Sequence, residues 1–325
     1  SVRDCEFRNG VQGIAFARKA RSRVENCTIK DMQNGGITCQ LGAFPELVGN
    51  TLDSTGTGIS CTQDSKPTIK NNTVSGCTTG LGLAGTLPAI EGNTLKNNKT
   101  GLVLSTGGGL VKGNRISGSQ TGLLCQQFSN PSVEKNEIFG NSEGIVCFRA
   151  SSPEIKNNEI YKNGSGISCV QLCNPKVSSN NIHDNKKGLF LDMSSYAVVH
   201  GNNIYANEVQ LELGNMSSDW ENKSKSKPER GSQAQNLTMA SRGRAVPQQI
   251  EDGAQIMGFV DASGNWWGDA TTAEMDAKGP NANIKSFIDY YDVPTRTYEG
   301  YSGIFVQDKV KYGGWKKSKI KINTQ

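Results

Sequence analysis

The sequence predicts an all-β protein: a single-stranded, right-handed parallel β-helix of about ten to eleven coils of ~22 residues, with a C-terminal cap. Two observations predict this fold. Three short apolar segments recur in each repeat, and none is long enough for a helix. A glycine followed by an aliphatic residue also returns every 21, 22 or 23 residues, at Gly13, Gly36, Gly58, Gly80, Gly101, Gly122, Gly144, Gly166 and Gly188.

Each apolar segment supplies a position that returns once per coil. The first is Val2, Val24, Leu47, Ile69, Ile90, Val111, Val133, Ile155, Val177 and Val199. The second, five residues later, is Phe7, Ile29, Leu52, Val74, Leu95, Ile116, Ile138, Ile160, Ile182 and Ile204. The third pairs the aliphatic residue after the glycine with Phe16, Cys39, Cys61, Leu83, Leu104, Cys125, Cys147, Cys169, Leu191 and Leu213, two residues further on. Spacing by two indicates strands whose inward side chains are buried only when coils stack.

Turn residues agree with three strands per coil. One asparagine file separates the first and second segments: Asn50, Asn72, Asn93, Asn114, Asn136, Asn158, Asn180 and Asn202. A shorter file, Asn141, Asn163, Asn185 and Asn207, separates the second and third. Asparagine tolerates left-handed backbone, and its amide can bond to neighbouring coils, so we expect structural ladders. Prolines precede several first strands, where a missing N–H costs least.

The pattern divides the chain into four parts. Residues 1–213 form the coils. Residues 214–255 are polar and aperiodic, which predicts an insertion loop. Residues 256–292 contain a final coil and cap, with Asn265 in the asparagine file and Trp267 at the second-strand position. Residues 293–325 are a C-terminal extension. No capping helix precedes the first coil, so we expect further coils, a cap or a partner chain at this end.

Two motifs point to a known group of proteins: the coil motif Asn158-Glu159-Ile160…Gly166-Ile167 and the last-coil motif Gly264-Asn265-Trp266-Trp267-Gly268. On these motifs the sequence resembles the NosD-like or CASH (carbohydrate-binding and sugar-hydrolase) group of right-handed β-helix proteins. The likeness covers about 1–213 and 256–292. The resemblance implies the fold, and it leaves open polysaccharide lyase, hydrolase or epimerase activity, a non-catalytic surface role, or an accessory role in metal-centre assembly. The Asp-Pro-His motif of alginate epimerases and the aspartate clusters of pectate-lyase-like and polygalacturonase-like enzymes are absent.

Alternation also predicts which side chains point outward. One outward ladder alternates in charge, and we interpret it as a structural ladder that stabilises the stack modestly. It consists of Lys70, Glu91, Lys112, Glu134 and Lys156. A second outward ladder is aromatic: Phe139, Tyr161, His183 and Tyr205. These rings form either a platform for sugar rings or a ladder covered by the C-terminal tail.

A third outward set is apolar and lies on coils six to ten. Soluble proteins rarely leave such a patch bare. We expect residues 214–255 or the tail after 292 to cover it, with a partner protein as the second choice. Phe148 and Phe190 join the aromatic ladder as ligand-binding candidates. The patch consists of Leu124, Val146, Phe148, Val170 and Phe190.

Acid–base residues are few in this C-terminal half. For a lyase, Arg149 with His183 or Tyr161 would supply the cation and the base. For a hydrolase, Asp192 and Glu212 are the one carboxylate pair we consider. Neither set is distinctive. We predict no cofactor and no metal site, because no C-x-x-C pair occurs in the sequence.

Nine cysteines occur, and five of them take inward positions that leucine fills elsewhere. They are therefore predicted to be small buried hydrophobic residues with reduced thiols. Reduced thiols suit a reducing setting, whereas the resemblance favours an extracytoplasmic location: periplasmic, secreted or cell-surface. A net charge of +5 gives no reason to expect nucleic-acid binding, and no apolar run approaches the ~20 residues of a membrane span.

The leading hypothesis is a non-catalytic scaffold or surface protein that presents its C-terminal half to a polysaccharide or a protein. A protein partner would bind the apolar face of coils six to ten or the N-terminal end. The first alternative is a polysaccharide-active enzyme, a lyase before a glycoside hydrolase, acting on an acidic glycan. The second alternative is a NosD-like accessory factor for metal-centre assembly.

Overall fold

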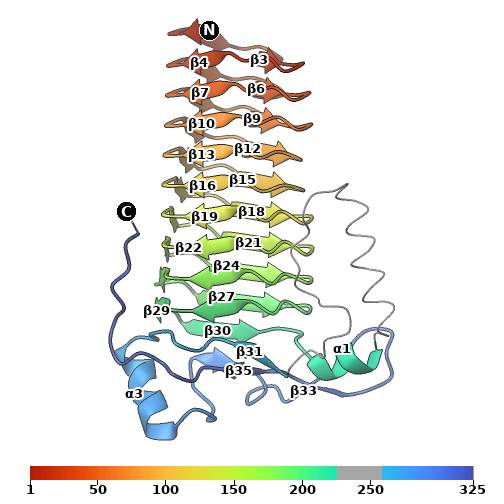
Figure 1. Cartoon of the computed structure of the whole chain (residues 1–325), viewed down its shortest axis with the longest axis vertical. Coiled ribbons are helices and arrows are strands. Elements are labelled where there is room, and N and C mark those ends of the chain that lie inside the picture. Colours follow the sequence, from red (N-terminus) through yellow and green to blue (C-terminus); the bar gives the residue numbers. More distant parts are fainter. Residues whose placement is uncertain (225–257, 325) are drawn as a thin grey trace.

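The structure, a computed structural model, describes residues 1–224 and 258–324. Figure 1 shows a rod of stacked coils with the N terminus at one end and the described helices at the other. Three parallel sheets run along the rod, and each of ten coils gives one strand to each sheet. The predicted right-handed parallel β-helix is therefore confirmed.

Sheet A contains β1 (Val2–Arg3), β4 (Arg23–Glu25), β7 (Glu46–Val48), β10 (Thr68–Lys70), β13 (Ala89–Glu91), β16 (Leu110–Lys112), β19 (Ser132–Glu134), β22 (Glu154–Lys156), β25 (Lys176–Ser178) and β28 (Val198–His200). Sheet B contains β2 (Glu6–Arg8), β5 (Thr28–Lys30), β8 (Thr51–Asp53), β11 (Thr73–Ser75), β14 (Thr94–Lys96), β17 (Arg115–Ser117), β20 (Glu137–Phe139), β23 (Glu159–Tyr161), β26 (Asn181–His183) and β29 (Asn203–Tyr205). Sheet C contains β3 (Gln12–Phe16), β6 (Gly35–Cys39), β9 (Thr57–Cys61), β12 (Thr79–Ala84), β15 (Thr100–Ser105), β18 (Thr121–Gln126), β21 (Glu143–Phe148), β24 (Ser165–Val170), β27 (Lys187–Asp192), β30 (Val209–Leu213) and β32 (Phe287–Ile288).

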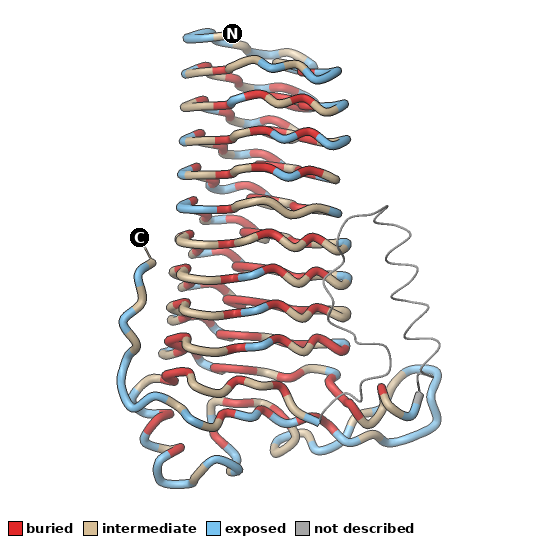
Figure 2. Tube along the Cα trace, in the orientation of Figure 1, coloured by how far each residue is buried: buried red, intermediate tan, exposed pale blue. Residues whose placement is uncertain are grey.

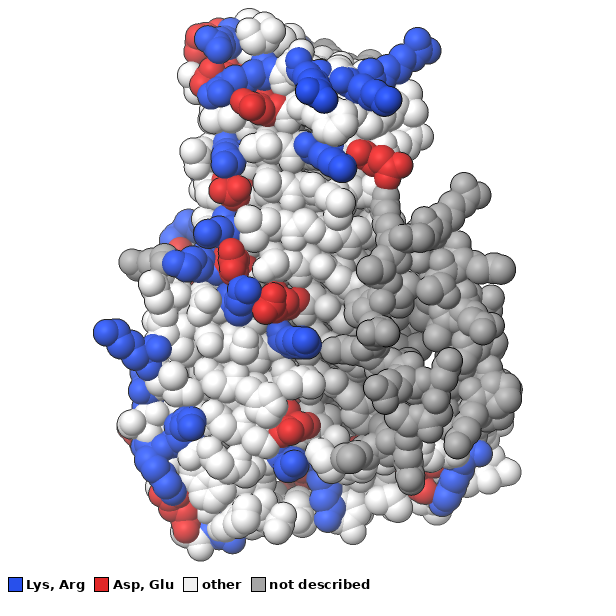
Figure 3. Space-filling view, viewed as in Figure 1, with Lys and Arg blue, Asp and Glu red and all other residues white. Residues whose placement is uncertain are grey.

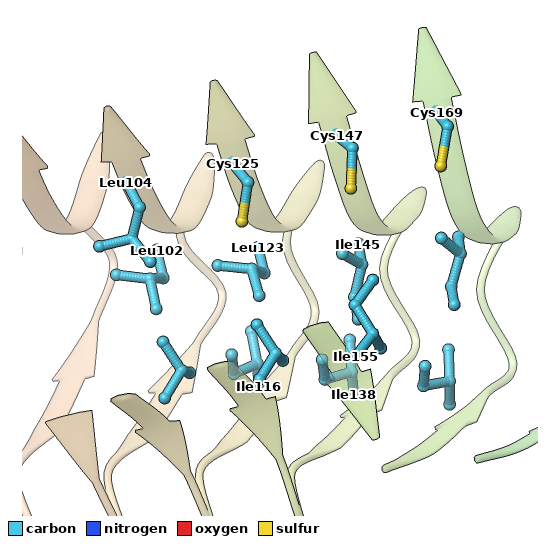
Figure 4. Close-up of a cluster of buried hydrophobic side chains, with 14 of the residues drawn as sticks. Leu102, Leu104, Ile116, Leu123, Cys125, Ile138, Ile145, Cys147, Ile155 and Cys169 are labelled. Carbon is cyan, nitrogen blue, oxygen red and sulfur yellow. The ribbon is translucent and has the colours of Figure 1, made fainter. Parts of the chain in front are cut away.

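The core consists of columns of equivalent side chains, one from each coil. Cys125 pairs with Cys147 in the parallel register, and Cys147 pairs with Cys169. Figure 4 shows these sulfur atoms pointing into the same interior as the neighbouring leucine and isoleucine columns. Buried positions repeat on coil after coil in Figure 2. The first coil differs, because Val2 and Phe7 are only partly buried there.

The glycine file has a steric cause. A Cβ atom added to Gly144 would lie 2.5 Å from the carbonyl oxygen of Gly166 on the next coil. The same clash recurs along the file, for example 2.4 Å between a Cβ at Gly80 and the oxygen of Gly101. Only glycine lets adjacent coils approach this closely at the point where sheet C begins.

Asparagine ladders satisfy the buried turns. Asn158 Oδ1 accepts hydrogen bonds from the backbone N and the Nδ2 of Asn136, both at 2.9 Å. Its own Nδ2 donates to Val133 O, Lys156 O and Asn180 Oδ1 at 2.9–3.0 Å. The first file continues to Asn265, as predicted, and the second begins earlier than predicted, at Asn98.

The residue with left-handed backbone lies one position before each ladder asparagine. This corrects the prediction that the ladder asparagines themselves adopt the left-handed conformation. Asn157 has φ 56° and Gly113 has φ 62°, whereas the ladder residues Asn158 and Asn114 that follow them are absent from the set with positive φ. Asparagine is required in the file for its amide group. The residue before it supplies the left-handed turn, and this is glycine or asparagine on most coils but Lys135 and Ser179 on two of them.

A third ladder, which the sequence analysis did not identify, lies at the turn between sheets C and A. Ser129 N donates to Ser151 Oγ, and Cys173 N donates to Ser195 Oγ, both at 3.1 Å. Small hydroxyl side chains do here what amides do at the other turns. Their signal is weaker in the sequence because serine, threonine, alanine and cysteine alternate at this position.

All nine cysteines are free thiols in the structure, and all except Cys5 are buried. Burial raises the pKa of the Cys125 thiol. The hydrogen bond with Cys169, followed by burial, raises the pKa of Cys147. These thiols therefore stay protonated and pack as small hydrophobic residues, in the inward positions that the sequence predicts.

The charge ladder on sheet A is present, and Figure 3 shows opposite charges alternating along one side of the rod. Lys70 Nζ lies 3.4 Å from Glu91, and Glu134 lies 3.8 Å from both Lys112 Nζ and Lys156 Nζ. These partly exposed pairs contribute little, about 0–1 kcal/mol each.

The last third of the chain closes the core of coil ten. It contains α1 (Ser218–Ser224), β31 (Phe259–Asp261), α3 (Asp269–Lys278), β33 (Thr295–Arg296), β34 (Phe305–Val306) and β35 (Lys309–Lys311). Trp267 is fully buried and its ring contacts Phe287, which in turn contacts Tyr312. The predicted loop 214–255 contains α1 after four residues of irregular chain, and its residues 225–255 lie outside the described residues. Among the described residues, no helix combines the length and apolarity that crossing a membrane requires.

Replacing Asn158 by alanine should lower the free energy of unfolding by about 3–5 kcal/mol, because several buried backbone and amide groups lose their partners. Urea unfolding followed by circular dichroism measures this. Asn34→Ala is the matched control, since Asn34 is exposed. Equal losses in the two variants would contradict the structural role of the ladder.

Gly144→Ala should lower the free energy of unfolding by about 3 kcal/mol, the upper end of the cost of overpacking. Gly82→Ala is the control, because its Cβ would meet only Thr57 and Thr79 methyl groups at 3.5 Å. The control should be unchanged or up to about 1 kcal/mol more stable. The same unfolding experiment compares them, and a stable Gly144→Ala protein would refute the close approach of the coils.

Candidate functional site

The predicted aromatic ladder is a continuous stack on the outer face of sheet B in coils seven to ten. Phe139, Tyr161, His183 and Tyr205 occupy the last position of successive strands and are paired in register. Their ring centroids lie 5.1, 5.3 and 4.8 Å apart, with interplanar angles of 3–14°. Each ring therefore uses its faces against the rings above and below it.

Both ends of the stack are covered. The Arg115 guanidinium lies 4.5 Å from the centroid of Phe139 at one end. At the other end, Tyr205 contacts Trp266 at 5.1 Å, and the ammonium of Lys319 lies 4.6 Å from the Tyr205 ring centroid. The stack presents ring edges and polar atoms outward, so sugar rings would meet these rather than free ring faces.

A polar column lies beside the stack, two positions earlier on the same strands. Tyr161 donates to Glu137 at 2.6 Å. Asn203 Nδ2 donates to Asn181 Oδ1, and Asn181 Nδ2 donates to Glu159 Oε2, both at 2.8 Å. The sequence analysis did not select these residues, although the same alternation that identified the aromatic ladder places them outward. We call the two columns together the aromatic–polar face: Glu137, Phe139, Glu159, Tyr161, Asn181, His183, Asn203 and Tyr205.

His183 is held between two carboxylates. Its Nε2 lies 2.7 Å from Glu159 Oε1, and its Nδ1 lies 2.6 Å from Asp184 Oδ2. Burial alone would lower the pKa of His183, but the hydrogen bonds and charges of the two carboxylates outweigh burial and raise it. Likewise, hydrogen bonds from His183 and Asn181 outweigh burial and lower the pKa of Glu159. The arrangement stabilises an imidazolium ion.

Tyr161 is unsuited to the role of a base. Burial, together with its hydrogen bond to the Glu137 carboxylate, raises the pKa of Tyr161 to about 12. A catalytic phenolate needs the opposite shift, since the ideal base has a pKa near the working pH. The phenol remains a hydrogen-bond donor.

The C-terminal tail lies on the aromatic–polar face. Ile320 N donates to Asn203 Oδ1, and Asn203 Nδ2 donates to Ile320 O, both at 2.8 Å. Thr324 Oγ1 donates to Glu159 Oε2 at 3.1 Å, and Lys319 Nζ donates to the Tyr205 hydroxyl at 3.0 Å. Figure 1 shows this segment leaving the capped end and running back along the rod. The sequence analysis left two interpretations of the aromatic ladder: a platform for sugar rings, or a ladder covered by the C-terminal tail. The structure shows the tail in contact with part of the ladder.

The lyase candidates do not form one site. His183 and Tyr161 belong to sheet B, whereas Arg149 follows β21 of sheet C, at the end remote from sheet B. Its guanidinium lies 5.0 Å from the Phe148 ring centroid. The structure therefore does not bring Arg149 together with His183 or Tyr161, because two residues can be outward on adjacent coils and still project from different sheets.

Asp192 and Glu212 share the outer face of sheet C, but each has a structural partner. Asp192 Oδ1 accepts hydrogen bonds from Met193 N at 2.9 Å and Asn215 N at 2.6 Å. Glu212 pairs with Lys187 Nζ at 2.9 Å. Among the described residues, no group of three or more histidine, cysteine or acidic side chains is placed to hold a metal ion.

The apolar patch forms two columns on sheet C. Leu124 is in register with Val146, and Phe148 with Val170, but Ser168 separates Val146 from Phe190. Lys187 Nζ lies 4.7 Å from the Phe190 ring centroid. The tail was one predicted cover for this patch, but its end lies on sheet B instead. The other predicted cover, 214–255, is mostly outside the described residues.

Comparison with known proteins agrees with the fold. The family model described as "Right handed beta helix region" matches residues 1–110 and 85–223. One crystal structure of a mutant of the periplasmic alginate epimerase AlgG has a TM-score of 0.62 and 12% identity, over 95% of this chain and 72% of that one. Another AlgG mutant has a TM-score of 0.55 and 15% identity, over 69% of this chain, and the match spans 63% of its length. No curated protein matches the sequence.

At these identities the structural likeness shows the fold alone. The narrower NosD-like or CASH assignment remains a prediction. The family match, by contrast, covers well over half of the chain and coincides with the coils seen in the structure. The chain belongs to the family of proteins with a right-handed β-helix region.

Proposed function

We propose that the protein is a non-catalytic β-helix scaffold, located outside the cytoplasm, that presents the aromatic–polar face of its C-terminal half to a glycan. The observation that carries this proposal is that the candidate acid–base side chains already have structural partners. His183 lies between Glu159 and Asp184, and Glu212 pairs with Lys187. A lyase or hydrolase needs an acid or base free to exchange a proton with its substrate.

The chemistry of the aromatic–polar face supports a glycan. Donors and acceptors both occur along it, from the Glu137 carboxylate, which pairs with Arg115, to the Asn181 and Asn203 amides. A polyhydroxylated ligand that lies along the axis would find a hydrogen-bonding group at every coil.

The fold neighbours add indirect support. Their titles name a periplasmic enzyme that acts on alginate, so a related fold handles a polysaccharide in an extracytoplasmic compartment. The same titles describe epimerases, which makes a polysaccharide-active enzyme the alternative that an experiment must exclude.

A glycan array that includes alginate, combined with lyase and epimerase assays on the same glycans, tests the function. We expect binding without turnover. Tyr161→Ala should weaken binding at least about tenfold, or ~1.4 kcal/mol, because it opens the stack and removes the phenol. Thr94→Ala, on the same outer face in coil five, is the control and should bind as the unaltered chain does. Unsaturated or epimerised products would refute the scaffold.

His183 should make stability depend on pH. Its pKa is raised in the folded state, so its stabilising contribution is fully present below the unfolded-state value of about 6.5 and is lost as pH rises through the folded-state value. His183→Phe keeps a ring in the stack and removes the ion pairs. The stability advantage of the unaltered chain over His183→Phe, measured by urea unfolding, should shrink from pH 6 to pH 9.

Tyr205→Phe is the control for this titration, because it alters the same stack and leaves the imidazole in place. Its stability difference from the unaltered chain should not shrink over that pH range in the way predicted for His183→Phe. An advantage over His183→Phe that stays constant from pH 6 to pH 9 would contradict the ion-pair role.

A further inference from the structure

We propose that residues 316–324 form a reversible strap that masks part of the aromatic–polar face and must leave before a glycan can occupy it. This regulatory inference rests on the proposed function, because it concerns access to the same face. Three features support this proposal. The tail binds polar groups of the face, it lies on the surface and not in the core, and the chain at its start is held firmly by the cap.

The tail uses the polar groups that a ligand would need. The Asn203 amide forms two hydrogen bonds with the backbone of Ile320, as a neighbouring strand would. Two coils further along, Thr324 binds the Glu159 carboxylate. Lys319 lies against the Tyr205 ring and hydroxyl at the end of the stack. A polymer along the axis would meet the same side chains, so tail and ligand exclude each other.

The tail lies on the surface rather than in the core. Its exposure alternates: Ile320, Ile322 and Thr324 are half-buried, whereas Lys319 and Lys321 are exposed. None of residues 316–324 is fully buried. Ordering an extended segment costs backbone entropy, and a few hydrogen bonds, two of them to the buried Asn203 amide, offset only part of that cost. Such segments belong to the least stable parts of a fold and open locally without unfolding of the core.

The residues just before the strap are held more firmly. Trp315 Nε1 donates to Asp276 Oδ1 at 2.8 Å, and its ring contacts Tyr312 in the cap. The first residue of the strap continues this anchor, because Lys316 N donates to Asn265 O at 2.9 Å, at the end of the first asparagine ladder. The strap can therefore detach while the cap remains closed. Because only the open fraction binds ligand, the strap raises the apparent dissociation constant.

The test compares the full chain with a chain that ends at Trp315, using alginate as the probe. Truncation should raise alginate affinity about tenfold while leaving the urea midpoint of the coils unchanged. Amide hydrogen exchange in 316–324 should be slowed in the free full chain and should speed up at least about tenfold when alginate saturates it. Ile320→Pro removes the N–H that binds Asn203 and should reproduce the truncation.

Lys321→Ala is the control within the tail, since that side chain is exposed, and it should change neither affinity nor exchange. Unprotected exchange of 316–324 in the free chain would overturn the strap, whatever the glycan result. Protection combined with equal alginate affinity in both chains would overturn the masking. If alginate binds neither chain, masking is refuted, and a glycan array negative for both chains would remove the proposed function as well.

Discussion

Stacking of equivalent residues at one fixed register is the constraint on which the rest of the structure depends. The parallel strand pairs place equivalent positions over one another through ten coils, for example Ile145 over Ile167 and Cys147 over Cys169, and they do the same for the outward side chains. A ladder exists wherever a residue type with a self-complementary group repeats at one position. The glycine file allows adjacent coils to approach closely. The asparagine files provide hydrogen-bond partners for the backbone groups of the buried turns.

The repeating part of the fold could be predicted because each position is sampled many times. Gly144 and Asn158 are informative through their equivalents on other coils, and the structure bears both files out. The physical role of Asn158 was less accessible, since asparagine is common both in ladders and in left-handed turns, and the left-handed residue lies directly before the file. The serine ladder around Ser151 was missed because serine shares its position with several other residue types.

The candidate site was only partly predictable. Alternation placed Tyr161 and His183 outward and on one ladder, and the structure agrees. It could not show that their ring faces are used within the stack, that Glu159 would hold the imidazole, or that Arg149 projects from another sheet. These depend on side-chain torsions and on the corner of the coil, which a repeat pattern does not specify. The contact of Thr324 with Glu159 could not be predicted either, because Thr324 lies in a segment outside the repeat.

The coil spacing has a consequence for how such a rod changes over evolutionary time. Each coil presents the same interface upward and downward, so loss or duplication of one complete unit would join matching surfaces, whereas a shift of one residue would turn inward side chains outward. The number of coils can therefore vary by whole units. The aromatic–polar face would keep its place beside the C-terminal cap if coils were gained or lost at the N-terminal end. The length of the rod can therefore change without any change in the aromatic–polar face.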